Sequence, residues 1–258
     1  MKILVCAKQV PEAEGIAVKT DDQGLAVMEN FGRFAMNHFD EFAVEQAVSI
    51  KESLPEVHVR VITVGPAQAS QVLKRAVGMG CGEGIHLLTS TDADPGSQAI
   101  ATWISEVAHA MAYDLVLCGS MSEDVMCGQV GPMTAALMDL PYATQVIGME
   151  LSSDLTHVTI EREIEGGARE MMNLPLPALL ALQPGINRPR YPSLSNLLRA
   201  NQKVFNTIPT DTLKPVKTHV DCLGFVLPKH SRAAKEITGS ALEKAAQTAA
   251  ILKAKALI

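Results

Sequence analysis

The residues best suited to chemistry follow an apolar run that ends at Cys118. Residues 119–134 read GSMSEDVMCGQVGPMT, with a glycine directly after the predicted strand and Pro132 near the start of a predicted helix. Proline suits the first helical positions, and the free N–H groups there attract anions. Residues 129–134 therefore predict a phosphate site, although many strand–helix turns bind nothing.

Acid–base catalysis is the other chemistry that this loop suggests. Glu123 and Asp124 are adjacent carboxylates, and paired carboxylates can act as general acid and base. No histidine or nucleophile lies near them in the sequence, so contact with a ribose or with the backbone is the favoured role. The sequence predicts no catalytic residue and, because metal-ligand spacings are absent, no metal site.

Three further segments are predicted to reach the same edge of a sheet. Residues 7–9 follow a predicted strand at 2–8, residues 37–40 open a predicted helix, and Val64 ends a predicted strand at 57–64. Open α/β sheets bind ligands outside the carboxyl ends of their strands. These segments and the 119–134 loop therefore predict one common binding site.

A second candidate region is the loop at residues 187–198, which reads NRPRYPSLSNLL. Its prolines fix φ and reduce the entropy cost of presenting a side chain to a partner. Tyr191 and Leu194 are the apolar residues that such a loop would expose, and recognition residues concentrate on loops held by rigid elements. Docking is therefore favoured over catalysis, with an ordinary proline-rich connector as the alternative.

The elements that would position these residues alternate between strand and helix. Predicted strands near 2–8, 57–64, 84–89 and 113–118 are separated by predicted helices at 37–52, 67–77 and 98–111, and the next helix starts near 131. This order indicates an α/β fold with a doubly wound, mostly parallel, Rossmann-like sheet. Within the first helix, Phe42, Ala43 and Ala47 are predicted on the buried side, with Glu45 elsewhere.

Two segments depart from this alternation. Residues 143–183 predict a β-rich segment with strands near 143–151, 156–164, 169–174 and 178–183, and residues 18–28 predict a hairpin. The tail at 201–258 has scattered prolines and an alanine-rich helix at 239–256. It is too thin to form its own core, so it must lie on its own domain or on a partner. The predicted division is a nucleotide-binding domain at 1–200 and an extended arm at 201–258.

Composition narrows the class of protein. The chain has 258 residues, 47% of them hydrophobic, which suffices for a large core. Its net charge of −6 argues against nucleic-acid binding, and no apolar run reaches the roughly 18 residues of a membrane span. The five cysteines are scattered without a CxxC pair, which favours reduced thiols. The start reads as a buried strand and not as a signal peptide, so a cytoplasmic protein is predicted.

Several short motifs occur in one collinear order. They are Lys8-Gln9-Val10-Pro11, Arg162-Glu163, Gly166-Gly167, Leu176-Pro177-Ala178, Asn187, Pro189-Arg190-Tyr191, Leu194 and Asn196. This order resembles the β subunit of the electron transfer flavoproteins. The resemblance extends over most of the first two hundred residues and fades after about Lys203.

The resemblance implies a heterodimer that passes electrons between flavin dehydrogenases and a downstream acceptor. The α subunit would hold most of the FAD, this chain would close one side of it, and the tail would reach over the α subunit. This chain would also bind an adenine nucleotide, either AMP or, in electron-bifurcating members, a second FAD. Tyr191 and Leu194 would dock a partner such as an acyl-CoA dehydrogenase. The implied nucleotide-binding residues are Ala7, Asn37, Phe39, Asp40, Val64, Asp124, Gln129, Val130, Gly131, Met133 and Thr134.

Departures from the family pattern leave some questions open. Bifurcating members usually read DGDTAQVGP, whereas this chain has Val125-Met126-Cys127-Gly128 between Asp124 and Gln129, so AMP is slightly favoured over FAD. Arg188 stands where the family usually has Glu, which leaves the partner's identity open. An adenine-nucleotide hydrolase or ligase would need a glycine-rich loop after the first strand, which is absent here. A nucleotide-binding sensor without a redox role fits the same pocket.

Overall fold

The computed structural model describes residues 1–12, 17–20, 26–29, 33–54, 56–90, 95–217, 220, 226 and 236–257. The chain forms two compact units. The larger unit comprises Met1–Ala17 and Met28–Leu223, and the smaller comprises Val18–Val27 and Gly224–Ile258. Among the described residues, no helix is both long and apolar enough to cross a membrane.

Apolar runs in the larger unit form a nine-stranded sheet in the order β11-β10-β9-β12-β8-β1-β6-β7-β13. From β9 to β13 along this order every neighbouring pair is parallel, and β9, β10 and β11 are antiparallel. The bounds are β1 Lys2–Cys6, β6 His58–Gly65, β7 Glu83–Leu88, β8 Leu115–Gly119, β9 Tyr142–Leu151, β10 His157–Glu163, β11 Arg169–Pro175, β12 Ala178–Leu182 and β13 Asn206–Pro209. The predicted α/β fold with a mostly parallel sheet is confirmed.

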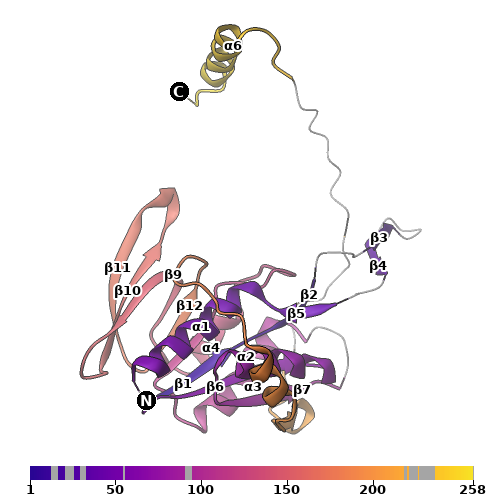
Figure 1. Ribbon diagram of the computed structural model, residues 1–258, viewed down its shortest axis with the longest axis vertical. Helices are drawn as coiled ribbons and strands as arrows, with labels where there is room; N and C mark the ends of the chain where they lie inside the picture. Colours follow the sequence, from indigo (N-terminus) through magenta and orange to yellow (C-terminus); the bar gives the residue numbers. More distant parts are fainter. Residues whose placement is uncertain are drawn as a thin grey trace. The chain divides into compact units, whose positions relative to one another are not determined.

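Helices cover both faces of this sheet (Figure 1), which explains why the inner strands are apolar on both sides. In β1, Ile3 and Val5 belong to a core cluster with residues of α1 and α2, whereas Leu4 belongs to a cluster with residues of α3 and α4. The bounds are α1 His38–Ser53, η1 Ala67–Ala69, α2 Ser70–Met79, α3 Ser97–His109, α4 Val130–Leu137 and α5 Leu194–Asn201. Helix α5 packs on α2.

The antiparallel strands form the β-rich segment that the sequence predicts. Strands β10 and β11 pair from His157 to Glu163, and the 3₁₀ turn η2 (Glu165–Gly167) joins them. Gly166 and Gly167 both have positive φ, at 77° and 74°, which glycine adopts without steric cost. The predicted reversal at these two glycines is therefore confirmed.

Four short strands lie among the described residues before α1. Strand β2 (Gln9–Pro11) pairs with β5 (Phe34–Met36). Strands β3 (Ala17–Thr20) and β4 (Ala26–Glu29) form a separate two-stranded sheet. The hairpin predicted at 18–28 is thus present, and its turn at 21–24 lies outside the described residues.

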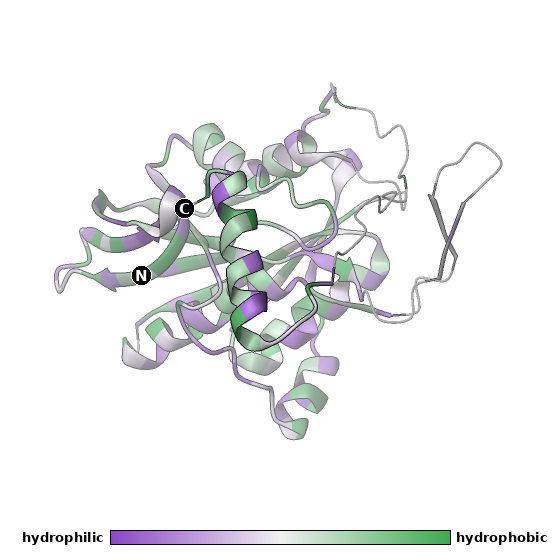
Figure 2. Cartoon of the chain, turned by 90° about the horizontal axis from the view of Figure 1, so that it is seen from above, coloured by the Kyte–Doolittle hydropathy of each residue, from purple (hydrophilic) through white to green (hydrophobic). Residues whose placement is uncertain are grey.

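The predicted arm at 201–258 contains two different kinds of structure. Strand β13 pairs with β7 in the main sheet, and Phe205 lies against Gly84 and packs on the core cluster that contains Leu73. Helix α6 (Ala241–Ala254) begins with a capping box and buries none of its residues. Figure 2 colours most of α6 as hydrophobic. The packing of the tail on a partner subunit stays a prediction.

This contrast within the tail leads to a stability prediction. Deleting residues 218–258 should leave the melting temperature of the isolated chain nearly unchanged, because α6 buries nothing. Deleting residues 203–258 should lower it by roughly 5 °C or more, because β13 and the packing of Phe205 on the core are lost. Differential scanning calorimetry of both truncations would measure this. Equal melting temperatures for the two truncations would contradict it.

Candidate functional site

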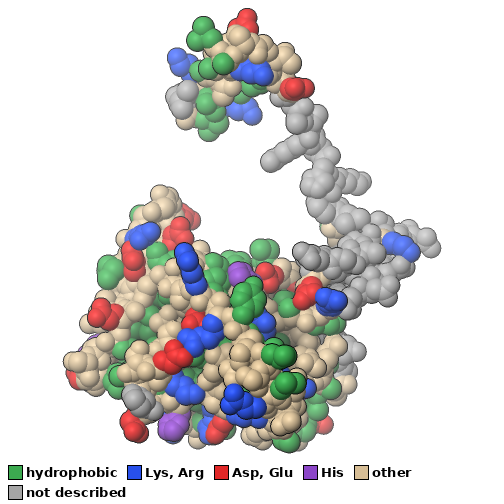
Figure 3. All heavy atoms as spheres, viewed as in Figure 1, with side chains coloured by type: hydrophobic (Ala, Val, Ile, Leu, Met, Phe, Trp, Pro, Cys, Tyr) green, Lys and Arg blue, Asp and Glu red, His purple; other side chains and the backbone are tan. Residues whose placement is uncertain are grey.

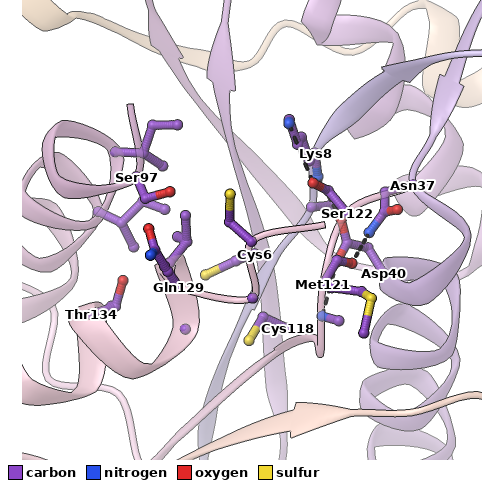
Figure 4. A pocket seen from close by; sticks show the side chains of 18 of the residues that line it. Cys6, Lys8, Asn37, Asp40, Ser97, Cys118, Met121, Ser122, Gln129 and Thr134 are labelled. Carbon is purple, nitrogen blue, oxygen red and sulfur yellow. Dashed lines mark hydrogen bonds between the residues drawn. The ribbon is translucent and has the colours of Figure 1, made fainter. Parts of the chain in front are cut away.

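A pocket opens at the carboxyl ends of β1, β6 and β8, where the sequence analysis predicts a ligand. Figure 4 shows Ser97, Gln129 and Thr134 on one side of it, and Lys8, Ser122, Asn37 and Asp40 on the other, with Cys6 and Cys118 between them. The first side consists of the starts of α3 and α4. The second consists of the end of β1, the start of α1 and the loop after β8.

Most of the predicted site residues meet at this pocket. The predicted residues that line it are Ala7, Asn37, Asp40, Val64, Gln129, Val130, Gly131 and Thr134. Phe39, Asp124 and Met133 are close in sequence to lining residues but are not part of the wall. The structure therefore brings the three predicted segments and the 119–134 loop together, and the binding roles of their residues remain predictions.

The floor of the pocket is apolar. Cys6, Ile62 and Cys118 lie on the strands beneath it, and Ile100 and Ile104 of α3 complete the floor. Burial raises the pKa of Cys6 to about 12, and burial likewise raises the pKa of Cys118. Both thiols are therefore neutral at neutral pH, and a floor of this kind suits an uncharged aromatic ring.

The N-terminus of α4 supplies donors to the pocket. Its N-cap residue, Gln129, makes no side-chain capping bond, and the first N–H of the helix to be bonded is that of Met133, which donates to Gln129 O at 3.0 Å. In the described part of the chain, the N–H groups of Val130 and Gly131 have no acceptor, as helix geometry dictates. A Cβ at Gly131 would lie 2.8 Å from Cys118 Sγ, so only glycine allows α4 to start this close to β8.

The hydroxyl of Thr134 is the side-chain group that most clearly indicates a ligand at this pocket. Its side chain is 1% exposed and lines the pocket, yet its Oγ1 has no hydrogen-bond partner among the described residues. A buried hydroxyl without a partner is costly, so native structures rarely leave one. Together with the N–H groups of Val130 and Gly131, it forms a donor set that fits an anionic oxygen.

Asp40 has a structural role at the centre of the site. Its carboxylate accepts hydrogen bonds from Lys8 N–H to Oδ2 at 2.8 Å and from Gly119 N–H to Oδ1 at 2.9 Å. It thus links the backbone at the ends of β1 and β8. A Cβ at Gly119 would lie 2.6 Å from Asp40 Oδ1, which explains the glycine. Burial raises the pKa of Asp40 to about 6, against the effect of these hydrogen bonds.

Polar contacts from the start of α1 hold the loop after β8. Asn37 Nδ2 donates to Met121 O at 2.9 Å, and Glu123 N–H donates to Asn37 Oδ1 at 3.1 Å. Asn37 occupies the predicted N-cap position but makes no side-chain capping bond. Glu123 Oε2 instead accepts from the N–H of His38, at 3.1 Å, so a distant loop residue satisfies the helix start.

Lys8 and Asp124 form an ion pair beside the pocket. Lys8 Nζ lies 2.8 Å from Asp124 Oδ1 and 2.7 Å from Oδ2. Burial opposes ionisation of Asp124, but the hydrogen bond and charge of Lys8 lower its pKa overall. Asp124 therefore remains an ionised partner of Lys8, which does not favour a role as a general acid. No group of three or more potential metal ligands occurs among the described residues.

Lys8 lines the pocket, in agreement with the predicted segment 7–9. The sequence analysis missed Ser97, a lining residue with a usable signal, because it follows Pro95-Gly96 at the start of α3. Gly96 has a φ of 81° and occupies the N-cap of α3. A Pro-Gly-Ser sequence before an apolar periodic run is a helix-start signal, so a second helix N-terminus at this pocket was predictable.

Comparisons with known proteins agree with one another. Residues 25–213 match the model of the electron transfer flavoprotein domain. The mitochondrial electron transfer flavoprotein subunit beta of Arabidopsis thaliana is 34% identical over 230 residues, which are 88% of this chain and 90% of the relative. The electron transfer flavoprotein subunit beta of Homo sapiens is 35% identical over 211 residues, 81% of each chain. That of Bacillus subtilis (strain 168) is 28% identical over 237 residues, 90% of this chain and 91% of the relative.

The buried carboxylate of Asp40 predicts a pH-dependent stability. Its pKa rises from an ordinary value of 3.8 to about 6 in the folded chain, so the folded state binds the proton more tightly than the unfolded state. The stabilising contribution is complete below about pH 4 and is lost as pH rises through about 6. Relative to Asp40→Asn, the wild type should lose about 3 kcal/mol of unfolding free energy over this range.

Denaturant titrations at several pH values would measure this difference. Asp139→Asn, which removes an exposed carboxylate, is the matched control and should follow the wild type. A constant difference between the wild type and Asp40→Asn from about pH 4 to about pH 6 would contradict the prediction.

Proposed function

Because this chain belongs to the family of electron transfer flavoprotein β subunits, we propose that it forms a heterodimer with an α subunit and carries electrons from flavin dehydrogenases to a downstream acceptor. The FAD is held mainly by the α subunit, and this chain encloses one side of it. The flavin supplies the electron chemistry, and the protein binds and orients it. The proposal includes the predicted cytoplasmic location.

The proposed ligand of this chain is one adenine nucleotide in the pocket above β1 and β8. The unpaired hydroxyl of Thr134 is the observation that carries this proposal. A phosphate oxygen would accept from it and from the N–H groups of Val130 and Gly131. The base would lie on the apolar floor, beside Ala7 and Val64.

The remaining predicted residues would shape this site without reaching the phosphate. Asn37 and Asp40 hold the wall formed by the loop after β8, with Phe39 behind Gly119. Asp124 keeps Lys8 beside the pocket. Gln129 and Met133 belong to the first turn of α4, where Met133 N–H bonds Gln129 O.

AMP is favoured over a second FAD. Met126 and Cys127 stand where bifurcating members have polar residues; Cys127 lines the pocket, and Met126 is exposed with a φ of 53°. These side chains offer few hydrogen bonds to a second ribose or to a larger phosphate group. Two alternative functions remain. One is an electron-bifurcating subunit with its own second FAD, and the other is a nucleotide-binding sensor without a redox role.

Two surfaces would contact partners. Helix α6 is rich in alanine and leucine but buries none of its residues, which supports the proposal that the arm at 201–258 packs on the α subunit. Tyr191 and Leu194 are 89% and 73% exposed. They would dock a redox partner such as an acyl-CoA dehydrogenase, as anchors on the domain at 1–200.

The nucleotide proposal predicts the content of the purified heterodimer. Acid extraction and chromatography should yield about one AMP per heterodimer in addition to one FAD. Thr134→Val removes the hydroxyl at nearly constant volume and should weaken AMP binding roughly 10- to 100-fold, because a hydrogen bond to a charged group is lost. Thr134→Ser keeps the hydroxyl and is the control. Finding two FAD per heterodimer would refute AMP as the ligand of this chain. Finding no adenine nucleotide would refute the proposal that the pocket binds one.

The docking proposal predicts the effect of Leu194→Ala. An exposed leucine that becomes fully buried in a partner contributes about 1.5–3 kcal/mol, so electron transfer from the dehydrogenase should slow roughly 10- to 100-fold at limiting concentration. Flavin content, nucleotide content and heterodimer assembly should not change. Leu137→Ala, which alters an exposed leucine at the end of α4, is the control. An unchanged electron-transfer rate in Leu194→Ala would contradict the docking proposal and would show that the loop is only a connector.

A further inference from the structure

Met111 lies in the turn between α3 and β8, and two polar side chains donate hydrogen bonds to its sulfur. Tyr113 Oη donates to Met111 Sδ at 3.1 Å, and Arg60 Nη1 donates to the same atom at 3.4 Å. Lys2 Nζ donates to the backbone carbonyl of Met111 at 3.1 Å. The residue is therefore held at its main chain and at its side chain.

The two donors to the sulfur are themselves fixed in place. Tyr113 is 5% exposed and belongs to the core cluster on which Met111 packs. Arg60 Nε pairs with Glu83, its neighbour across β6 and β7. Figure 3 shows Lys and Arg side chains beside Asp and Glu side chains over the visible face of the larger unit. Arg60 adds to such a pair a second N–H group that is directed at a sulfur.

A thioether is a poor acceptor for these donors. Its sulfur accepts hydrogen bonds weakly, whereas a guanidinium N–H and a phenolic O–H form stronger hydrogen bonds with oxygen. The burial of Tyr113 also limits the access of its hydroxyl to water. Oxidation of a methionine to its sulfoxide places an oxygen on the sulfur and makes the side chain polar. The oxidised side chain would therefore satisfy both donors better than the reduced one.

We propose that Met111 is a site of reversible oxidation by hydroperoxides, and that its sulfoxide oxygen accepts the hydrogen bonds of Arg60 and Tyr113. With hydrogen peroxide, a lone pair of the sulfur attacks one peroxide oxygen, the O–O bond breaks and the S–O bond forms. The other oxygen leaves as water with both protons of the peroxide. The sulfur loses two electrons and the peroxide gains them. Methionine sulfoxide reductases reverse the step with two electrons from thiols and release the oxygen as water.

This site is separate from the nucleotide pocket. Met111 follows the C-terminal end of α3, whereas Ser97 and Ile100 near its N-terminal end line the pocket. Likewise, Arg60 lies near the start of β6 and the pocket residue Val64 near its end. The inference therefore does not rest on the proposed function, and oxidation of Met111 should leave nucleotide binding unchanged.

Exposed methionines provide the comparison within the same chain. Met126 and Met171 are 63% and 66% exposed, so water can solvate their sulfoxides. Met111 is half-buried, and a sulfoxide in such a position usually disrupts packing because its oxygen has no donor. The expected distinction of Met111 is that oxidation occurs there without loss of stability.

The test treats the complete heterodimer with hydrogen peroxide and measures the sulfoxide at each methionine by peptide mass spectrometry. Met111 should be oxidised, and methionine sulfoxide reductases should restore its original mass. Met111→Leu keeps nearly the same volume but has no sulfur at this position. After oxidation, the wild type should melt within about 1 °C of Met111→Leu, because the sulfoxide oxygen is satisfied. The nucleotide content of both should be the same before and after oxidation.

Tyr113→Phe removes one donor and keeps the ring. After oxidation, this variant should melt about 4 °C below the double variant Tyr113→Phe, Met111→Leu, because the sulfoxide has lost a partner. Met171→Leu is the matched control at an exposed methionine and should melt with the wild type before and after oxidation.

Two results would overturn the proposal. One is a Met111 that stays reduced while Met126 and Met171 are oxidised. The other is an oxidised wild type that melts several degrees below oxidised Met111→Leu, which would show that Arg60 and Tyr113 do not accommodate the sulfoxide. Neither comparison requires Tyr113→Phe to fold, and neither depends on which nucleotide the heterodimer contains.

Discussion

The carboxylate of Asp40 is the constraint on which the pocket depends. It lies between the ends of β1 and β8 and accepts one backbone N–H from each, at Lys8 and Gly119. Neighbouring parallel strands diverge into different connections at this edge, so their last N–H groups need acceptors from elsewhere. Because Gly119 has no Cβ, the carboxylate approaches close enough to supply them. The burial that raises the pKa of Asp40 is the energetic cost of this arrangement.

The contacts around Asp40 hold the ends of two strands and the loop after β8 in place beside the pocket. Asn37 and Glu123 tie the loop to the start of α1, and Lys8 neutralises Asp124. Cys6 is neutral through burial. Among the described residues that line the pocket, the hydroxyl of Thr134 and the N–H groups of Val130 and Gly131 have no partner, which is consistent with a subunit that positions a nucleotide.

Helix α1 connects the two candidate functional regions. Its first residues form the wall of the pocket, and its middle carries Glu45, which binds Arg190 of the docking loop. Burial opposes ionisation of Glu45, but the hydrogen bonds and charge of Arg190 lower its pKa overall. Because the carboxylate of Glu45 is buried, removing Arg190 would leave it without its compensating charge, which destabilises the fold. The loop at 187–198 is therefore held by the same helix that forms part of the pocket wall.

The order of strands and helices and the edge of the sheet that carries the site were predictable from the sequence. Apolar periodicity and glycine–proline signals are local, and they placed Ala7, Val64 and residues 129–131 at one pocket. Periodicity also predicts the buried side of α1, but it assigned Glu45 to the outer side, and this prediction was wrong.

Only the tertiary structure decided the polar contacts. Arg190 and Glu45 are 145 residues apart in the chain, and Lys8 and Asp124 are 116 apart. The pairing of β13 with β7 at the edge of the main sheet also joins segments that are far apart in the chain. A charged residue shows no local sign of the partner that compensates its burial, because that partner is brought to it by the packing of apolar faces elsewhere in the chain.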